Sequence, residues 1–343
     1  MIGFFAPHGK RAIGSCIQRT SPRIITLGLS VWVLCGMGVA LSGPTSSIND
    51  LFDAGEYTKV TSILQQALAT NPRDAQANLW MARCYFELGD FDQSIRYAEQ
   101  AEALEPGSSQ AHLWLARAYG RKAERAKSFT LARKVRREFE RAVELDPNNL
   151  PARRDLMEYY LGAPWILGGG QHKAWQQAEA IAARDVVEGH LARAAFWDEV
   201  RQPAKAEAEY RQALESRSAR VEPYFEVAEF FQSRNDGAHM EAATQAAGAL
   251  NPNDPRLAYF RGVAMVLKGH QLPEAERLLN AYLAGTPNRS DYPSHASAYE
   301  WLGRLYELQG RAQKAAEQYR SALRLDSERR EAREGLRRLH MNP

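Results

Sequence analysis

The residues of this chain that could do chemistry are its histidines, cysteines, serines and acidic side chains, and their spacing assembles no site. No two histidines have the helical spacing of a zinc site, and no histidine is paired with a cysteine at a zinc-ligand interval. No serine lies in a nucleophile-elbow pattern. We therefore expect no catalytic residue, no metal ion and no cofactor. The eight histidines are dispersed, and five of them lie in five separate stretches of the chain: His112, His190, His239, His270 and His295.

Tryptophan and arginine, two types that are enriched at binding surfaces, recur three positions apart. Trp80 precedes Arg83, and Trp114 precedes Arg117. We expect the acidic portion of an extended or helical segment to bind at these two arginines. The alternative is that the arginines pair with neighbouring glutamates while the tryptophans fill the packing between helices.

The elements that carry these residues repeat along the chain. Residues 75–108 align with residues 296–329, both 34 residues long, so that Tyr85 matches Tyr306 and Gly89 matches Gly310. Each unit contains an amphipathic helix, a glycine break and a second amphipathic helix, in a composition dominated by alanine, glutamate, arginine and leucine. Two short helices cannot bury their apolar faces alone, so neighbouring units must stack.

This pattern resembles the tetratricopeptide repeat (TPR) family. Ala82, Tyr85, Gly89, Ala101 and Pro106 carry the resemblance in the second unit. We count about eight units between residues 44 and 329, followed by a polar closing helix. The resemblance implies an all-α, right-handed superhelical solenoid over residues 44–340 with a C-terminal capping helix.

The resemblance also implies a role. TPR arrays bind proteins or peptides in a concave groove that the first helix of each unit lines, and they usually have no catalytic activity. The family's lysine–asparagine carboxylate clamp is absent here, since Leu79 and Arg83 occupy those positions in the second unit. The middle of the groove is expected to be acidic, with Asp198 and Glu226 among its residues. The candidate groove residues are Leu79, Trp80, Arg83, Phe86, Leu113, Trp114, Arg117 and Arg121.

The third unit is seven residues too long, and the excess predicts an extended helical hairpin that turns near Lys127 and Ser128. Residues 121–141 of this hairpin hold nine basic and three acidic residues. The hairpin is a solvated face, or it binds an acidic protein or an anionic membrane surface. Nucleic acid is not an expected partner.

The fourth unit contains a glycine-rich loop, residues 162–173. Pro164 closes its first helix, and Gly168–Gly170 allow the chain to reverse, but no lysine–serine pair follows them as in a phosphate-binding loop. The apolar loop tip is Trp165, Ile166 and Leu167. The tip either packs on the hairpin around Phe129, Leu131 and Val135 or forms part of a partner site.

Residues 1–43 form a basic leader with an apolar segment at residues 24–41. This order is typical of an export signal, and the segment is either cleaved after Ser42 or retained as a membrane anchor. Without the leader the formal net charge falls from +3 to −1, so the basicity belongs to the leader. We expect an exported scaffold that is periplasmic, extracytoplasmic or membrane-anchored. The alternatives are a membrane-surface assembly factor that uses hairpin 121–141 and a cell-envelope enzyme.

Overall fold

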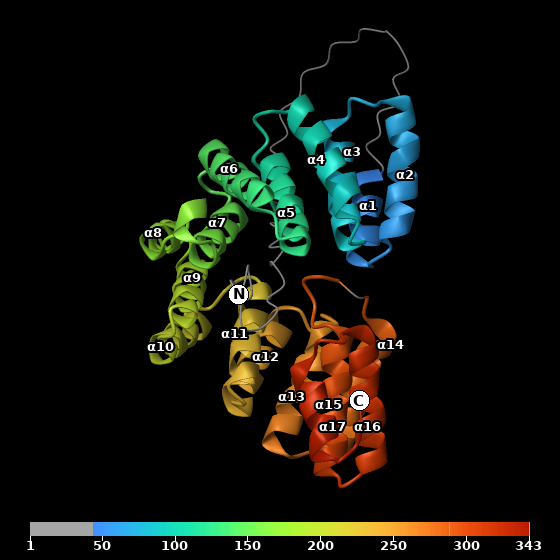
Figure 1. The fold of residues 1–343 in the computed structure, drawn as a ribbon. Helices are drawn as coiled ribbons and strands as arrows, with labels where there is room; N and C mark the ends of the chain where they lie inside the picture. Colours follow the sequence, from blue (N-terminus) through green and yellow to red (C-terminus); the bar gives the residue numbers. More distant parts are fainter. Residues whose placement is uncertain (1–43, 288, 343) are drawn as a thin grey trace, which may run out of the picture.

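The computed structural model describes residues 44–287 and 289–342, and every regular element within them is helical, with no strand (Figure 1). The predicted leader, residues 1–43, lies outside the described residues. None of the described helices is both long and apolar enough to cross a bilayer. The elements are α1 (Pro44–Asp53), α2 (Tyr57–Thr70), α3 (Ala75–Glu87), α4 (Phe91–Leu104), α5 (Ser109–Ala126), α6 (Phe129–Leu145), α7 (Leu150–Gly162), the 3₁₀ helix η1 (Trp165–Leu167), α8 (Gln171–Ala182), α9 (Val186–Glu199), α10 (Pro203–Glu215), α11 (Glu222–Ser233), α12 (Gly237–Leu250), α13 (Arg256–Lys268), α14 (Leu272–Gly285), α15 (His295–Leu308), α16 (Ala312–Leu325) and α17 (Arg330–Arg338).

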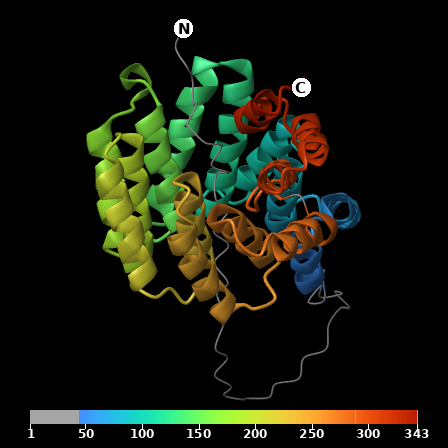
Figure 2. The same cartoon turned by 90° about the horizontal axis from the view of Figure 1, so that it is seen from below.

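Consecutive helices pack in pairs, and the pairs stack side by side along a curved path (Figures 1 and 2). The described chain forms eight pairs, from α1 with α2 to α15 with α16, and α17 packs on the last pair. The first helix of a pair also contacts the first helix of the next, as α3 does with α5 and α13 with α15. First helices therefore line the inner wall of the curve. The predicted all-α superhelical solenoid with a C-terminal capping helix is confirmed.

Local sequence explains why each unit folds as a helix pair. Gly89 follows α3 at φ +74°, a left-handed conformation that ends a helix at little cost for glycine. Asp90 then begins α4, because its side chain accepts a hydrogen bond from the Gln93 amide at 3.1 Å. Small residues let the paired helices approach, and a β-carbon at Gly303 would lie only 2.5 Å from the Tyr319 ring.

The third and fourth pairs carry the two irregular features. Helices α5 and α6 have 18 and 17 residues, and the chain turns at Lys127, with φ +48°, and Ser128. The Ser128 hydroxyl caps α6 by accepting a hydrogen bond from the Leu131 amide at 3.3 Å. In the fourth pair, α7 ends at Gly162, the single turn η1 follows Pro164, and α8 begins at Gln171.

The two ends of the solenoid meet. The loop between α14 and α15 reaches the turn between α1 and α2, and both views show these segments together (Figures 1 and 2). Arg289 Nη1 donates to the backbone oxygen and to Oδ1 of Asp53, both at 3.0 Å. Ser290 donates to Glu87 from its hydroxyl at 2.9 Å and from its amide at 3.2 Å. We call Arg289, Ser290 and their acceptors Asp53 and Glu87 the clasp.

Candidate functional site

The apolar residues predicted to line the groove lie in the core. Each has at most 9% of its surface exposed, so they serve mainly to pack one helix pair on the next. The Phe86 ring meets the Trp114 ring edge-on, with 5.6 Å between their centroids. What these residues present to a ligand is therefore limited to their edges. They are Leu79, Trp80, Phe86, Leu113 and Trp114.

Arg117 is committed to an internal partner. Its Nε donates to Asp155 Oδ2 at 2.6 Å, and both side chains are almost fully buried. Burial raises the pKa of the Asp155 carboxyl, and the adjacent Arg117 opposes this rise. The guanidinium also lies 4.7 Å from the centre of the Trp114 ring. Arg117 thus joins α5 to α7. It has an internal acidic partner, as the alternative interpretation of the sequence expected, but the partner is an aspartate and not a glutamate.

Arg121 lies at the exposed end of the same helix. Its Nη1 forms an ion pair with Glu124 at 3.3 Å, and its guanidinium lies 5.7 Å from the centre of the Phe91 ring. The ion pair is at the surface, where such a pair contributes little to stability. Arg121 remains accessible, but it lies beyond the packed part of the inner wall.

Arg83 is different, because within residues 44–287 and 289–342 no hydrogen-bond or ion-pair partner is found for it. Its guanidinium stacks on Trp80 at 3.8 Å, with Phe52 at 4.8 Å and Trp114 at 5.4 Å from the respective ring centres. Its Nε is buried and forms no hydrogen bond, and the same is true of Nε1 of Trp80. Burial, together with the positive charge of Arg117, lowers the pKa of Arg83 to about 10.

The carboxylates whose charges raise the pKa of Arg83 are engaged by the clasp. Asp53 and Glu87 both raise the pKa of Arg83 through their charges. Their hydrogen bonds, however, are made elsewhere: Asp53 accepts from Arg289, and Glu87 accepts from Ser290. Burial raises the pKa of Glu87, and the hydrogen bonds from Ser290 oppose the rise. The clasp therefore leaves a cation of the inner wall stacked among aromatic rings, with no carboxylate of the described residues in a direct hydrogen bond or ion pair with it.

The middle of the inner wall is less acidic than its composition suggests. Glu226 forms an ion pair with Arg154, which also lies 3.4 Å from Glu188. Burial lowers the pKa of Arg154, but the surrounding carboxylates outweigh burial and raise it well above its ordinary value. Asp198 pairs with Arg234 at 3.0 Å. The expected acidic stretch is thus largely neutralised by arginines.

The tip of the glycine-rich loop is divided between core and solvent. Leu167 is 1% exposed and packs in the core with Val135, whereas Trp165 is 84% exposed and Ile166 is 52% exposed. Packing against hairpin 121–141 therefore accounts for Leu167 alone. Phe129, at the start of α6, is also 44% exposed.

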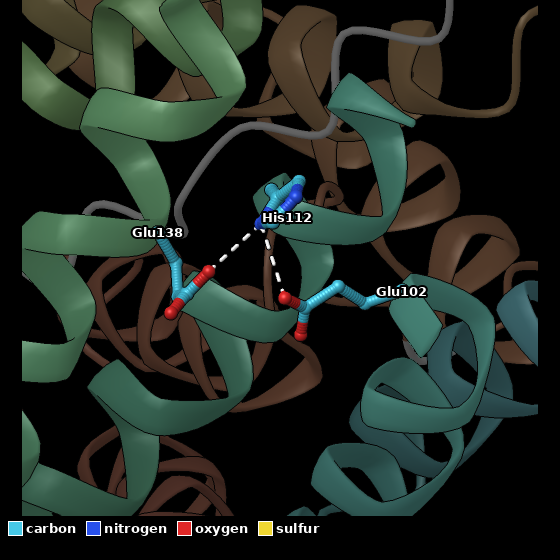
Figure 3. A group of neighbouring side chains, drawn as sticks. All are labelled: Glu102, His112 and Glu138. Atoms are coloured by element: carbon cyan, nitrogen blue, oxygen red, sulfur yellow. Dashed lines mark hydrogen bonds and ion pairs between the residues drawn. The ribbon is translucent and has the colours of Figure 1, made fainter. Parts of the chain in front are cut away.

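A second cluster joins three helices around His112 (Figure 3). His112 Nδ1 lies 2.8 Å from Glu138 Oε2 and 4.0 Å from Glu102 Oε1, and Nε2 lies 3.2 Å from the Pro106 oxygen. Burial opposes the charged ring, but the hydrogen bonds with Glu138 and Pro106 outweigh it and raise the pKa of His112. Because both ring nitrogens face acceptors, the geometry suits an imidazolium.

The same three side chains could hold a metal ion only in place of that proton. Their ligand atoms lie within 4.8 Å of one another. Arg137, however, already donates to the second oxygen of Glu138 at 2.7 Å and competes for its charge. The cluster spans two repeats, so no spacing in the sequence reveals it.

Comparisons with known proteins agree with this architecture. Sequence models of the tetratricopeptide repeat family match residues 51–101 in one case, and residues 81–149 and 266–329 in another. No curated protein sequence gives a significant match.

Among solved structures, the APC/C hetero-tetramer Cut9-Hcn1 contains a chain with a TM-score of 0.50 and 14% identity. The match covers 88% of this chain and 57% of that one, so this chain spans little more than half of that neighbour's length. A thermophilic TPR protein from Thermus thermophilus has 21% identity and a TM-score of 0.47, covering 55% of this chain and 97% of that one. A tetratricopeptide repeat protein from Parabacteroides merdae has 16% identity and a TM-score of 0.46, covering 78% and 99%. These likenesses concern the fold alone. The matched residues, 51–149 and 266–329, are tetratricopeptide repeats, and the stacked helix pairs of the described chain have the same architecture throughout.

Proposed function

We propose that this chain is a non-catalytic scaffold outside the cytoplasm that binds an acidic segment of a protein partner at Arg83. The TPR fold itself supports a protein-interaction role. The observation that carries the finer proposal is the state of Arg83: a stacked guanidinium on the inner wall whose Nε is buried and unpaired. A buried charge without a partner is costly, so a carboxylate that pairs with it gains both charge and hydrogen bonds.

Equivalent tryptophan–arginine pairs elsewhere in the chain show what is special about Arg83. Arg117 follows Trp114 but is paired with Asp155. Arg304 stacks on Trp301 at 4.2 Å and donates to Asn235 at 3.3 Å. The same position in the repeat is therefore satisfied internally in the third and eighth pairs and left open in the second. A planar guanidinium can accept a carboxylate through two parallel hydrogen bonds while its face stays on the indole.

Peptide binding to the full chain tests this role. An array of synthetic peptides is probed, each made once with a glutamate pair and once with glutamines in its place. We expect the chain to select glutamate forms and Arg83→Met to weaken that selection by at least about tenfold, the low end for a charge-assisted pair. Arg304→Met changes the equivalent arginine and should leave selection intact. Equal binding by the wild-type chain and Arg83→Met, or no preference for glutamate, would reject the proposal.

Export is proposed from the sequence of residues 1–43, whose basic start precedes the apolar residues 24–41. Fractionation of cells followed by mass measurement of the intact protein tests it. A mass that begins at Gly43 would establish cleavage, and a full-length protein in the membrane fraction would establish an anchor. Full-length protein in the cytoplasmic fraction would contradict export.

A further inference from the structure

The glycine-rich loop is a rigid platform. The Tyr159 hydroxyl donates to the Leu167 oxygen at 3.0 Å, and the Gly170 amide donates to the Tyr160 oxygen at 2.8 Å. Leu167 anchors the loop in the core. A β-carbon at Gly169 would lie 1.8 Å from the Ala163 oxygen, so the loop doubles back more tightly than any other residue would allow. This construction fixes the position of the tip.

The platform holds two large apolar side chains in water. Trp165 and Ile166 project from it and are 84% and 52% exposed, although the adjacent residue Leu167 is buried in the apolar core. Rigid exposure of an indole and a branched alkyl group is unfavourable in a free protein and points to a surface that covers them. Because the tip is a protruding turn, a surface that covers it must be able to deform around it.

Cations surround this tip. Arg136 Nη1 donates to the Leu167 oxygen at 3.4 Å, and Lys173 Nζ donates to the Gly168 oxygen at 3.1 Å. Arg133, exposed on the same helix as Arg136, contributes with it to the positive field at the Tyr159 hydroxyl. Glu140 is the acid that acts there, and it is engaged by Arg136 at 3.7 Å. The rim of the tip therefore has a net positive charge.

We propose that Trp165 and Ile166 insert into the interfacial layer of an anionic lipid bilayer while Arg133, Arg136 and Lys173 meet its phosphate groups. Indole rings favour the boundary between headgroups and acyl chains, and nearby cations are attracted to an anionic surface. The excess of basic residues along hairpin 121–141 extends the same charge beyond the tip. This surface is formed by α6, η1 and the start of α8, away from Arg83 on α3, so the proposal does not rest on the inner-wall function.

A local probe is needed, because the apolar residues 24–41 could bind lipid by themselves. The full chain carries Ile166→Cys with Cys16→Ser and Cys35→Ser, and an environment-sensitive fluorophore is attached at position 166. Cys84 does not compete for the label, since it is fully buried and burial raises the pKa of its thiol to about 12. Leu325→Cys, at an exposed site on α16, is the matched control.

Vesicles of phosphatidylcholine, with and without phosphatidylglycerol, distinguish the outcomes. We expect the label at position 166 to shift to the blue and to be quenched by brominated lipid on phosphatidylglycerol vesicles alone. The label at position 325 should stay in water. Arg133→Glu with Lys173→Glu, or raised salt, should abolish the shift at position 166. Vesicle-bound protein whose position 166 remains in water would overturn the proposal, and so would a shift that requires a protein partner instead of lipid.

Discussion

Replacing Arg289 with alanine should release one end of the solenoid from the other. Arg289 is 7% exposed and makes two hydrogen bonds to Asp53, while Asp291 holds the rest of its guanidinium. Breaking a fully buried ion pair costs about 3–5 kcal/mol. Here Asp53 is 43% exposed and regains water, so the loss should be closer to that of one charged hydrogen bond, about 2 kcal/mol. That value corresponds to a roughly thirtyfold rise in the population with an open clasp.

Hydrogen exchange of backbone amides measures this opening. Stacked repeats couple mainly to their neighbours, so the change should be confined to α1, α2 and the loop before α15 and should spare α7–α10. Arg277→Ala is the control, because Arg277 is an exposed arginine of α14 that pairs only with Glu274 of its own helix among the described contacts. If Arg289→Ala leaves exchange of α1 and α2 at the wild-type rate, the clasp does not hold the ends together and this reasoning is wrong.

Two further predictions concern the His112 cluster and the glycine-rich loop. The folded state raises the pKa of His112 above its ordinary 6.5, so the His112 cluster should stabilise the protein fully below pH 6.5 and lose that contribution as pH rises through the raised pKa. Unfolding temperatures measured across this pH range should show the loss. The variant His112→Gln should abolish this pH dependence, whereas His172→Gln, at an exposed site, should leave it unchanged. Gly169→Ala should lower the unfolding temperature, because overpacking costs about 1–3 kcal/mol of stability. Gly170→Ala should not, because a β-carbon at Gly170 would meet nothing within 4 Å. Equal effects of the two substitutions would show that the tight reversal at Gly169 is not required.

Periodic features of the chain could be read from its sequence. The 34-residue period predicts helix pairs because apolar residues and glycine breaks recur at fixed offsets, and the seven extra residues of the third unit predict the hairpin turn at Lys127 and Ser128 where the structure has it. Trp165 could be recognised as part of a loop tip, but its exposure depends on how Leu167 fills the core. That choice is made by packing, which the pattern does not contain.

Contacts between distant units could not be read in this way. The partner of Arg117 is Asp155 in the following repeat, and the partner of Arg289 is Asp53, 236 residues away. Such pairs depend on the accumulated rotation of the stacked units, and small changes per unit sum over the array.

The contact between Asp53 and Arg289 also constrains how this chain can evolve. An open array tolerates the gain or loss of a unit, since only the two flanking units must adapt. Here one unit more or fewer would rotate the α14–α15 loop away from the α1–α2 turn and separate the two residues. The number of repeats is therefore tied to the pitch of the superhelix, and a change in one requires a compensating change in the other.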